Sequence, residues 1–161
     1  MESTIMEKNI DILILMGSDS DWEVMSGASI ILERFGISYE TRVSSAHRTP
    51  DRTLRIVREA EKNGCKVIIA GAGAAAHLAG VVAGHTLLPV IGIPLSATSL
   101  QGIDALLATV QMPAGMPVAS MAIGKAGATN AALFALQILA SSNPEIAQQL
   151  SDYRQKMAQG G

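Results

Sequence analysis

Residues 10–22 read IDILILMGSDSDW, and this stretch decides the fold. Its first seven residues are apolar except Asp11, which is the pattern of a strand covered on both faces. The apolar run stops at Gly17, and four short polar residues lead into a helical pattern that begins at Trp22. The stretch therefore predicts a buried strand, a tight turn and a helix.

The polar turn at residues 17–21 allows two interpretations. Free backbone N–H groups and hydroxyls at the start of a helix form a site for an anion such as phosphate. Serine and aspartate at these positions are also common helix caps, which need no ligand. The turn by itself leaves both interpretations open.

Length and composition indicate one globular domain over residues 1–161, in which residues 1–9 are expected to form a flexible start. A chain of this size buries roughly two-thirds of its unfolded surface. The net charge of −2 gives no electrostatic argument for nucleic acid or an anionic membrane. No apolar run is continuous enough for a membrane span, and the start lacks the features of a signal peptide. A single cysteine, Cys65, excludes an internal disulfide. We expect a cytoplasmic protein.

Strand and helix patterns alternate along the whole chain. Apolar runs predict strands at residues 10–16, 37–43, 66–70, 89–93 and 118–123. Helical spacing with suitable end residues predicts helices at residues 22–35, 50–63, 77–84, 102–110, 126–140 and from residue 144 onward. Repeated βα units imply a mostly parallel sheet between helical layers. The predicted fold is α/β, a three-layer sandwich with a flavodoxin-like or Rossmann-like five-stranded sheet and an extra C-terminal helix.

The middle of the chain is almost free of charge. Asp104 is the only charged residue between Lys66 and Lys125, and the predicted helix at residues 126–140 carries none. Because an outer helix of a small monomer normally shows a charged face, we expect subunits of a homo-oligomer to pack there. The alternative is a helix buried centrally within one subunit.

The turn after the second strand, residues 44–50, reads SSAHRTP. In folds of this class such turns lie together at the carboxyl ends of the strands, where ligands bind. Arg48 suits bidentate recognition of phosphate, and His47 can give and take a proton near neutral pH. The alternatives are an ion pair of Arg48 with Asp51 or Asp21, and a loop-capping hydrogen bond for His47.

The turn after the third strand, residues 71–80, reads GAGAAAHLAG and matches a dinucleotide-binding G-x-G-x-x-A spacing. That fingerprint also needs an acidic residue about 20 positions later, and none occurs at residues 62–103. We interpret the turn as a wall whose small side chains let the backbone approach a small ligand closely. His77 either faces that ligand or caps the next helix.

Several motifs together resemble the PurE family in its class I form, the 5-(carboxyamino)imidazole ribonucleotide mutases of bacterial purine biosynthesis. They are GSDSDW at residues 17–22, SAHRTP at 45–50, the Gly/Ala-rich turn that ends in AHL, TVQMPAGMPV at 109–118 and AIGKAG at 122–127. The resemblance runs from about residue 10 to the last helix. It implies a flavodoxin-like fold, a ribonucleotide substrate, an octamer with sites at subunit junctions, and no metal or organic cofactor.

The resemblance also implies roles for individual residues. Ser18 and Arg48 are the implied phosphate ligands with Ser45 nearby, Asp21 the ligand of the ribose hydroxyls, and His47 the acid/base residue. A carboxylate suits a sugar diol because it accepts hydrogen bonds from hydroxyls and repels phosphate. The implied wall around the migrating carboxyl group consists of Gly71, Ala72, Gly73, Ala74, His77 and Leu78.

The implied reaction moves a carboxyl group from the exocyclic nitrogen of the nucleotide to ring carbon 4, by loss and recapture of carbon dioxide. The alternatives are a carboxylase that takes up free carbon dioxide, as in the related class II enzymes, and a non-catalytic nucleotide-binding module. Two residues depart from the family pattern: Ala74 stands where a second glycine is usual, and Ala79 where a proline is usual. The methyl group of Ala74 is expected to narrow the pocket.

Overall fold

The computed structural model describes residues 9–160, so the predicted flexible start falls almost entirely on residues 1–8, outside this range. All strands of the sheet are parallel, in the spatial order β2-β1-β3-β4-β5. This is the flavodoxin-like order, with its topological switch point between β1 and β3. The predicted α/β fold is confirmed. The strands are β1 (Ile12–Met16), β2 (Tyr39–Val43), β3 (Val67–Gly73), β4 (Val90–Leu95) and β5 (Ala119–Ser120).

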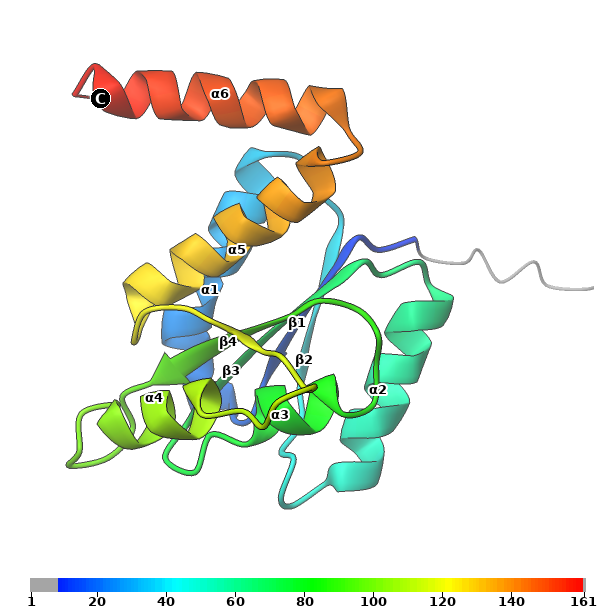
Figure 1. Ribbon diagram of the computed structural model, residues 1–161, viewed down its shortest axis with the longest axis vertical. Helices are drawn as coiled ribbons and strands as arrows, with labels where there is room; N and C mark the ends of the chain where they lie inside the picture. The colour runs from blue at the N-terminus through cyan, green and yellow to red at the C-terminus, as the bar shows by residue number, and fades with distance from the viewer. Residues whose placement is uncertain (1–8, 161) are drawn as a thin grey trace, which may run out of the picture.

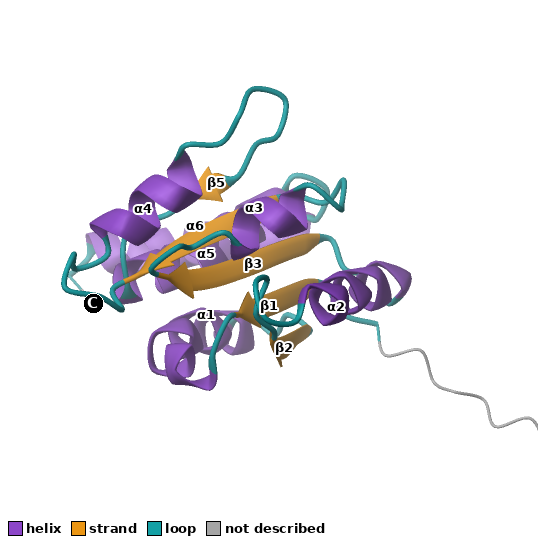
Figure 2. Cartoon of the chain, turned by 90° about the horizontal axis from the view of Figure 1, so that it is seen from below, coloured by secondary structure: helices purple, strands orange, loops and turns teal. Residues whose placement is uncertain are grey.

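Helices cover both faces of the sheet (Figure 2). A short 3-10 helix η1 (Asp19–Asp21) precedes α1 (Trp22–Arg34), and the others are α2 (Pro50–Lys62), α3 (Leu78–Ala83), α4 (Ile103–Val110), α5 (Lys125–Ala140) and α6 (Pro144–Ala158). Helices α1 and α5 lie side by side on one face, α2, α3 and α4 lie on the other, and α6 extends from the end of α5 (Figure 1). Within the described residues, no helix combines the length and apolar character needed to cross a membrane.

Strand β1 shows why the sequence there is apolar at every position. Ile12, Ile14 and Met16 pack with α1 and α5, whereas Leu13 and Leu15 pack with α2 and α3. All five side chains are at most 1% exposed. Each such burial contributes about 1.5–3 kcal/mol to folding, so this central strand anchors both layers.

All five strands depart from the predicted bounds, and β3 and β5 do so where the chain approaches the carboxyl edge of the sheet. Strand β3 runs three residues further, through Gly73, because residues 71–73 pair with the end of β4. Strand β5 has only two residues in place of the predicted 118–123. Beyond it, single bonds run from Met121 N to Gly92 O and from Gly124 N to Pro94 O, both 2.9 Å, as the chain turns into α5.

Packing within the chain accounts for much of the uncharged sequence of α5. Its fully buried residues face α1 and the sheet, and they are Ala128, Ala131, Ala132, Ala135 and Leu136. Only this face of α5 is buried, so the helix is not buried centrally as in the alternative, and packing of subunits against its other face stays a prediction. On the outward side, Phe134 is the large apolar side chain that remains exposed, at 37%.

Candidate active site at the carboxyl edge of the sheet

The three polar or small-residue turns meet at the carboxyl edge of the sheet around a cavity of about 370 Å³. The first turn contributes Gly17, Ser18, Ser20 and Asp21, the second Ser45, Ala46, His47 and Arg48, and the third Ala72, Gly73, Ala74, Ala75 and Leu78; Ala97 follows β4. Every predicted site residue is therefore in the lining except Gly71 and His77.

In the first turn, Ser18 and Asp21 form a capping box. Ser18 is the N-cap of η1, and its backbone N–H donates to Asp21 Oδ2 at 3.0 Å. Ser18 Oγ and Ser20 Oγ lie 3.0 Å apart and share a hydrogen bond at the cavity. Burial raises the pKa of Asp21 above its ordinary value, against the opposing effect of backbone N–H donors. Capping is thus found at η1, whereas Asp21 makes no side-chain capping bond to α1, and both side chains line the cavity.

The second turn is fastened to the first turn of α2 by hydroxyl groups. Ser44 Oγ lies 2.8 Å from Thr53 Oγ1 and 3.1 Å from Thr49 Oγ1, and Ser44 and Thr53 are buried. Ser45 Oγ accepts the backbone N–H of Arg48 at 3.2 Å. These bonds hold the segment that carries His47 and Arg48 against the edge of the sheet.

Arg48 takes part in none of the ion pairs among residues 9–160, which are Arg42–Glu40, Lys66–Asp11 and Lys125–Glu23. The predicted alternative, a pair with Asp51 or Asp21, is therefore not found. An exposed guanidinium beside a cavity, bound to no carboxylate of the described part of the chain, is available for an anionic ligand.

The imidazole of His47 contacts the third turn. His47 Nε2 and His77 Nδ1 lie 2.7 Å apart, and the rings meet edge to face at 87°. His77 occupies the N-cap position of α3, but its side chain caps no backbone group. The capping alternative for His77 is therefore wrong; its side chain contacts His47 at the cavity, and a ligand-facing role stays a prediction.

Small residues in the third turn are required by close contacts. A β-carbon on Gly71 would lie 2.2 Å from Met25 Sδ, so Gly71 serves packing beneath the cavity. A β-carbon on Gly73 would lie 2.5 Å from Ala97 Cβ, so this position lets the loops after β3 and β4 touch. Ala74 has a φ of +53°, the left-handed region that favours glycine, which agrees with the glycine usual there in the family pattern.

Sequence reasoning missed several lining residues, among them Gly17, Ser20, Ala46, Ala75 and Ala97. Four of these lie inside the turns that the sequence predicts at the site. Their position in those turns was therefore the signal that could have identified them. Ala97 had only one signal, its place after the fourth predicted strand.

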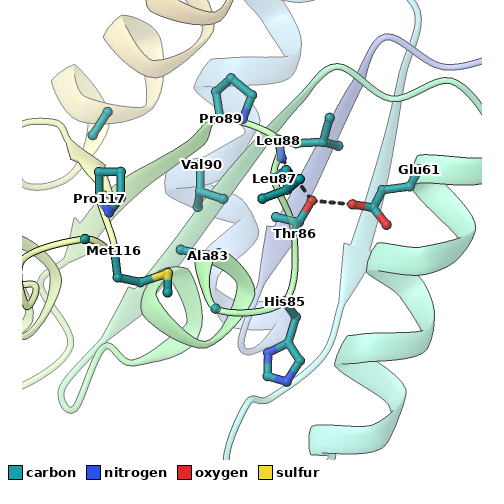
Figure 3. Close-up of a pocket in the computed structure, with 13 residues that line it drawn as sticks. Glu61, Ala83, His85, Thr86, Leu87, Leu88, Pro89, Val90, Met116 and Pro117 are labelled. Carbon is teal, nitrogen blue, oxygen red and sulfur yellow. Dashed lines mark hydrogen bonds between the residues drawn. The ribbon is translucent and has the colours of Figure 1, made fainter.

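A larger cavity, of about 790 Å³, lies at the opposite edge of the sheet (Figure 3). It is lined by the segment 83–90, by residues 115–117 and by Ala119, at the amino ends of β4 and β5. Two hydrogen bonds join residues of its lining: Thr86 Oγ1 donates to Glu61, and the backbone N–H of Leu88 donates to Thr86 Oγ1 at 3.1 Å. The smaller cavity is the better candidate because an imidazole, a guanidinium, a carboxylate and hydroxyls converge on it.

Within residues 9–160, no group of three His, Cys, Asp or Glu side chains is placed to hold a metal ion.

Comparison with known proteins agrees with this fold. A family model described as AIR carboxylase matches residues 11–160. An N5-carboxyaminoimidazole ribonucleotide mutase of Brucella melitensis is 52% identical over 146 residues, which cover 91% of this chain and 90% of the relative. A protein of the same name from Pyrococcus abyssi is 54% identical over 144 residues, covering 89% of this chain and 82% of the relative. The crystal structure of Treponema denticola PurE superposes with a TM-score of 0.84 at 32% identity and covers 92% of both chains. The chain therefore belongs to the AIR carboxylase family.

Proposed function

We propose that this chain is an N5-carboxyaminoimidazole ribonucleotide mutase of purine biosynthesis. The observation that carries the proposal is the convergence of Ser18, Arg48 and His47 on one cavity. Relatives about half identical over most of their length bear this name, which adds support for the mutase over other members of the family.

The substrate's ribose phosphate is bound by the first two turns. The guanidinium of Arg48, which forms no ion pair among residues 9–160, and the hydroxyl of Ser18 at the cavity bind the phosphate. Ser45 supports Arg48 through its backbone bond. The carboxylate of Asp21 accepts hydrogen bonds from the ribose hydroxyls.

His47 moves the proton. The C–N bond of the carbamate breaks, carbon dioxide leaves, and protonated His47 gives its proton to the exocyclic nitrogen. The electron-rich ring carbon 4 then attacks the carbon dioxide and forms the new C–C bond. Removal of the proton from carbon 4 by His47 restores both the aromatic ring and the starting protonation state of the enzyme.

The third turn confines the carbon dioxide. Its residues Ala72, Ala74 and Leu78, together with Ala97 from the neighbouring loop, line the cavity and carry no charge. An uncharged wall of this kind disfavours a solvated carbamate and keeps the released molecule close to carbon 4. The phosphate-binding groups keep the ring at a fixed distance from His47.

The working form is a homo-oligomer, for which the family resemblance implies eight copies. Support for association comes from one face of α4 and from Leu100 in the loop before it: Leu100, Ile103, Leu107 and Val110 are 60%, 53%, 55% and 47% exposed. Such a contiguous apolar stripe is typical of a protein–protein contact.

We also infer a cytoplasmic location, because the single cysteine is a free buried thiol, as suits a reducing compartment.

The test is an assay without ATP on the N-carboxylated nucleotide labelled in its carbamate carbon, in unlabelled bicarbonate. A mutase forms the C-carboxylated nucleotide with the label retained. A carboxylase forms product with the label diluted and depends on added carbon dioxide. A binding module retains nucleotide but forms no product, and either of these last two results overturns the proposal.

A further inference from the structure

Asp104 is the only charged residue between Lys66 and Lys125, and the proposed mechanism gives it no role. It lies in the first turn of α4, where a carboxylate is favoured by the helix dipole. One oxygen, Oδ1, is buried without a hydrogen-bond partner among the described groups, which is unfavourable for a carboxylate. Another contact of the side chain must therefore account for its position.

That contact is with the loop between β4 and α4, residues 96–102. Thr98 Oγ1 donates to Asp104 Oδ2 at 2.8 Å and accepts the backbone N–H of Leu100 at 3.1 Å. Gln101 N donates to Thr98 O at 3.1 Å. The Asp104 carboxylate thus binds Thr98, and Thr98 in turn binds the backbone of Leu100 and Gln101. These hydrogen bonds connect the turn of the loop to α4.

The loop is held in a conformation that its own backbone does not favour. Gln101 has a φ of +54° and Gly102 a φ of +88°, so two successive residues are left-handed. A residue with a β-carbon keeps such a φ only where surrounding contacts enforce it, and such outliers cluster at functional sites. The Thr98–Asp104 hydrogen bond is the side-chain contact that ties this turn to α4.

The same loop carries Ala97 into the cavity wall. Its Cβ lies only 2.5 Å from where a β-carbon of Gly73 would be, so the loop rests directly on the end of β3. A small outward shift of the loop would open the wall between Ala97 and Gly73. The position of the wall therefore depends on the bonds of Thr98.

We propose that Asp104 is a positioning residue, which holds Ala97 against Gly73 through Thr98 and so keeps the carbon dioxide wall closed. The inference rests on the proposed function. It predicts that loss of the bond releases the loop and lets carbon dioxide escape between the two half-reactions. The hydrogen bond is charge-assisted, so its loss is expected to lower kcat/KM by about tenfold or more.

The experiment compares Asp104→Ala and Thr98→Val with the conservative variants Asp104→Asn and Thr98→Ser. The conservative variants keep an acceptor or a hydroxyl and are expected to stay within about threefold of the wild type. The disrupting variants are expected to lose label from the product in the labelled-carbamate assay. The double variant Asp104→Ala/Thr98→Val should lose no more than either single variant, because the two residues act through one bond.

A matched control is available at the other edge of the sheet. Ser38 Oγ donates to Asp11 Oδ2, also at 2.8 Å, far from the cavity. Ser38→Ala should lower the melting temperature by a similar amount but leave kcat/KM and label retention unchanged. A merely structural role for Asp104 would give the same pattern as this control, and that result overturns the proposal.

A second measurement separates failure of this inference from failure of the proposed function. Hydrogen exchange of the Leu100 and Gln101 amides needs no substrate. Faster exchange at both amides in Asp104→Ala, with protection kept in Asp104→Asn, supports the loop tether even if the chain proves not to be a mutase. Unchanged exchange together with retained label overturns it.

Discussion

His47 Nε2 lies 2.7 Å from His77 Nδ1, although the two residues are 30 positions apart in sequence. The bond joins the turn after β2 to the turn after β3, so it fixes the orientation of the His47 imidazole at the cavity. The two rings are not equivalent, because His47 lines the cavity and His77 does not. In the proposed mechanism, His47 is therefore the imidazole that exchanges protons with the substrate, and His77 the one that orients it.

Replacing His47 should therefore stop turnover without unfolding the chain. For His47→Asn we expect kcat to fall by about 10²-fold to 10⁴-fold, the usual contribution of general acid–base catalysis. The side chain is not buried, so the melting temperature should stay close to that of the wild type. Steady-state kinetics and calorimetric binding of the nucleotide measure the two effects. Turnover within tenfold of the wild type would contradict the assignment.

A substitution of His77, the hydrogen-bond partner of His47, is the matched comparison for His47→Asn. His77→Asn removes the orienting bond but leaves the His47 imidazole at the cavity, so kcat should fall by less than about tenfold. Solvent can still exchange protons with His47. Equal losses in the two variants would mean that the imidazoles act as one unit, and the assignment of a single acid/base residue would then be wrong.

Arg48 should dominate recognition of the phosphate. Charge-assisted hydrogen bonds contribute about 1.5–3 kcal/mol, so Arg48→Met is expected to raise KM by about 10-fold to 100-fold. Arg48→Lys should give a smaller increase, because it keeps the charge but loses the bidentate geometry. The control is Arg55→Met on the exposed side of α2, which should leave KM unchanged. Equal KM values for Arg48→Met and the wild type would exclude the phosphate role.

Much of this site followed from the sequence because parallel strands bring their carboxyl ends to one edge. The buried pattern of β1 fixed where the first turn lies, and Pro50 fixed where the second ends. The end of β3 was missed because glycine and alanine have low strand propensity, so residues 71–73 looked like a loop. Pairing with β4 overrides that local preference.

Ala97 was beyond sequence reasoning for a different reason. An alanine has no chemistry that marks it, and its place in the wall comes from a contact with Gly73 across two loops. The His47–His77 bond is likewise a tertiary contact. From the sequence, His77 was expected either to face a ligand or to cap the next helix. Only the fold shows that its imidazole pairs with the imidazole of His47.

Replacing Asp21 should change the stability of the fold and the binding of substrate in different ways. Burial raises the pKa of this carboxyl, so the folded state holds its proton more strongly than the unfolded state does. The contribution of Asp21 to stability is therefore greatest at low pH and is lost as the pH rises through the folded pKa. Asp21→Asn keeps an acceptor for Ser18 N but carries no charge, so its melting temperature relative to the wild type should rise from acid to neutral pH.

The same variant should bind substrate less well at neutral pH. A neutral amide accepts weaker hydrogen bonds from ribose hydroxyls than a carboxylate does, so KM is expected to rise by about tenfold. Melting curves across the acid range and KM near pH 7 check the two effects. A variant that is destabilised at neutral pH, or that keeps the wild-type KM, would contradict this account of Asp21.

Assembly should depend on the apolar face of α4. Leu107 is 55% exposed at the middle of the stripe described above, and Phe134 is 37% exposed on the outward side of α5. If copies associate through α4, Leu107→Glu introduces a charge that must be desolvated in the contact, and the assembly should dissociate. Arg58→Glu, on the exposed charged side of α2, is the control and should leave the assembly intact. Sedimentation velocity at micromolar concentration measures the result. If Phe134→Glu dissociates the assembly and Leu107→Glu does not, the contact lies on α5, as the uncharged sequence of that helix predicts. If the wild type is a monomer, neither surface forms a contact between copies.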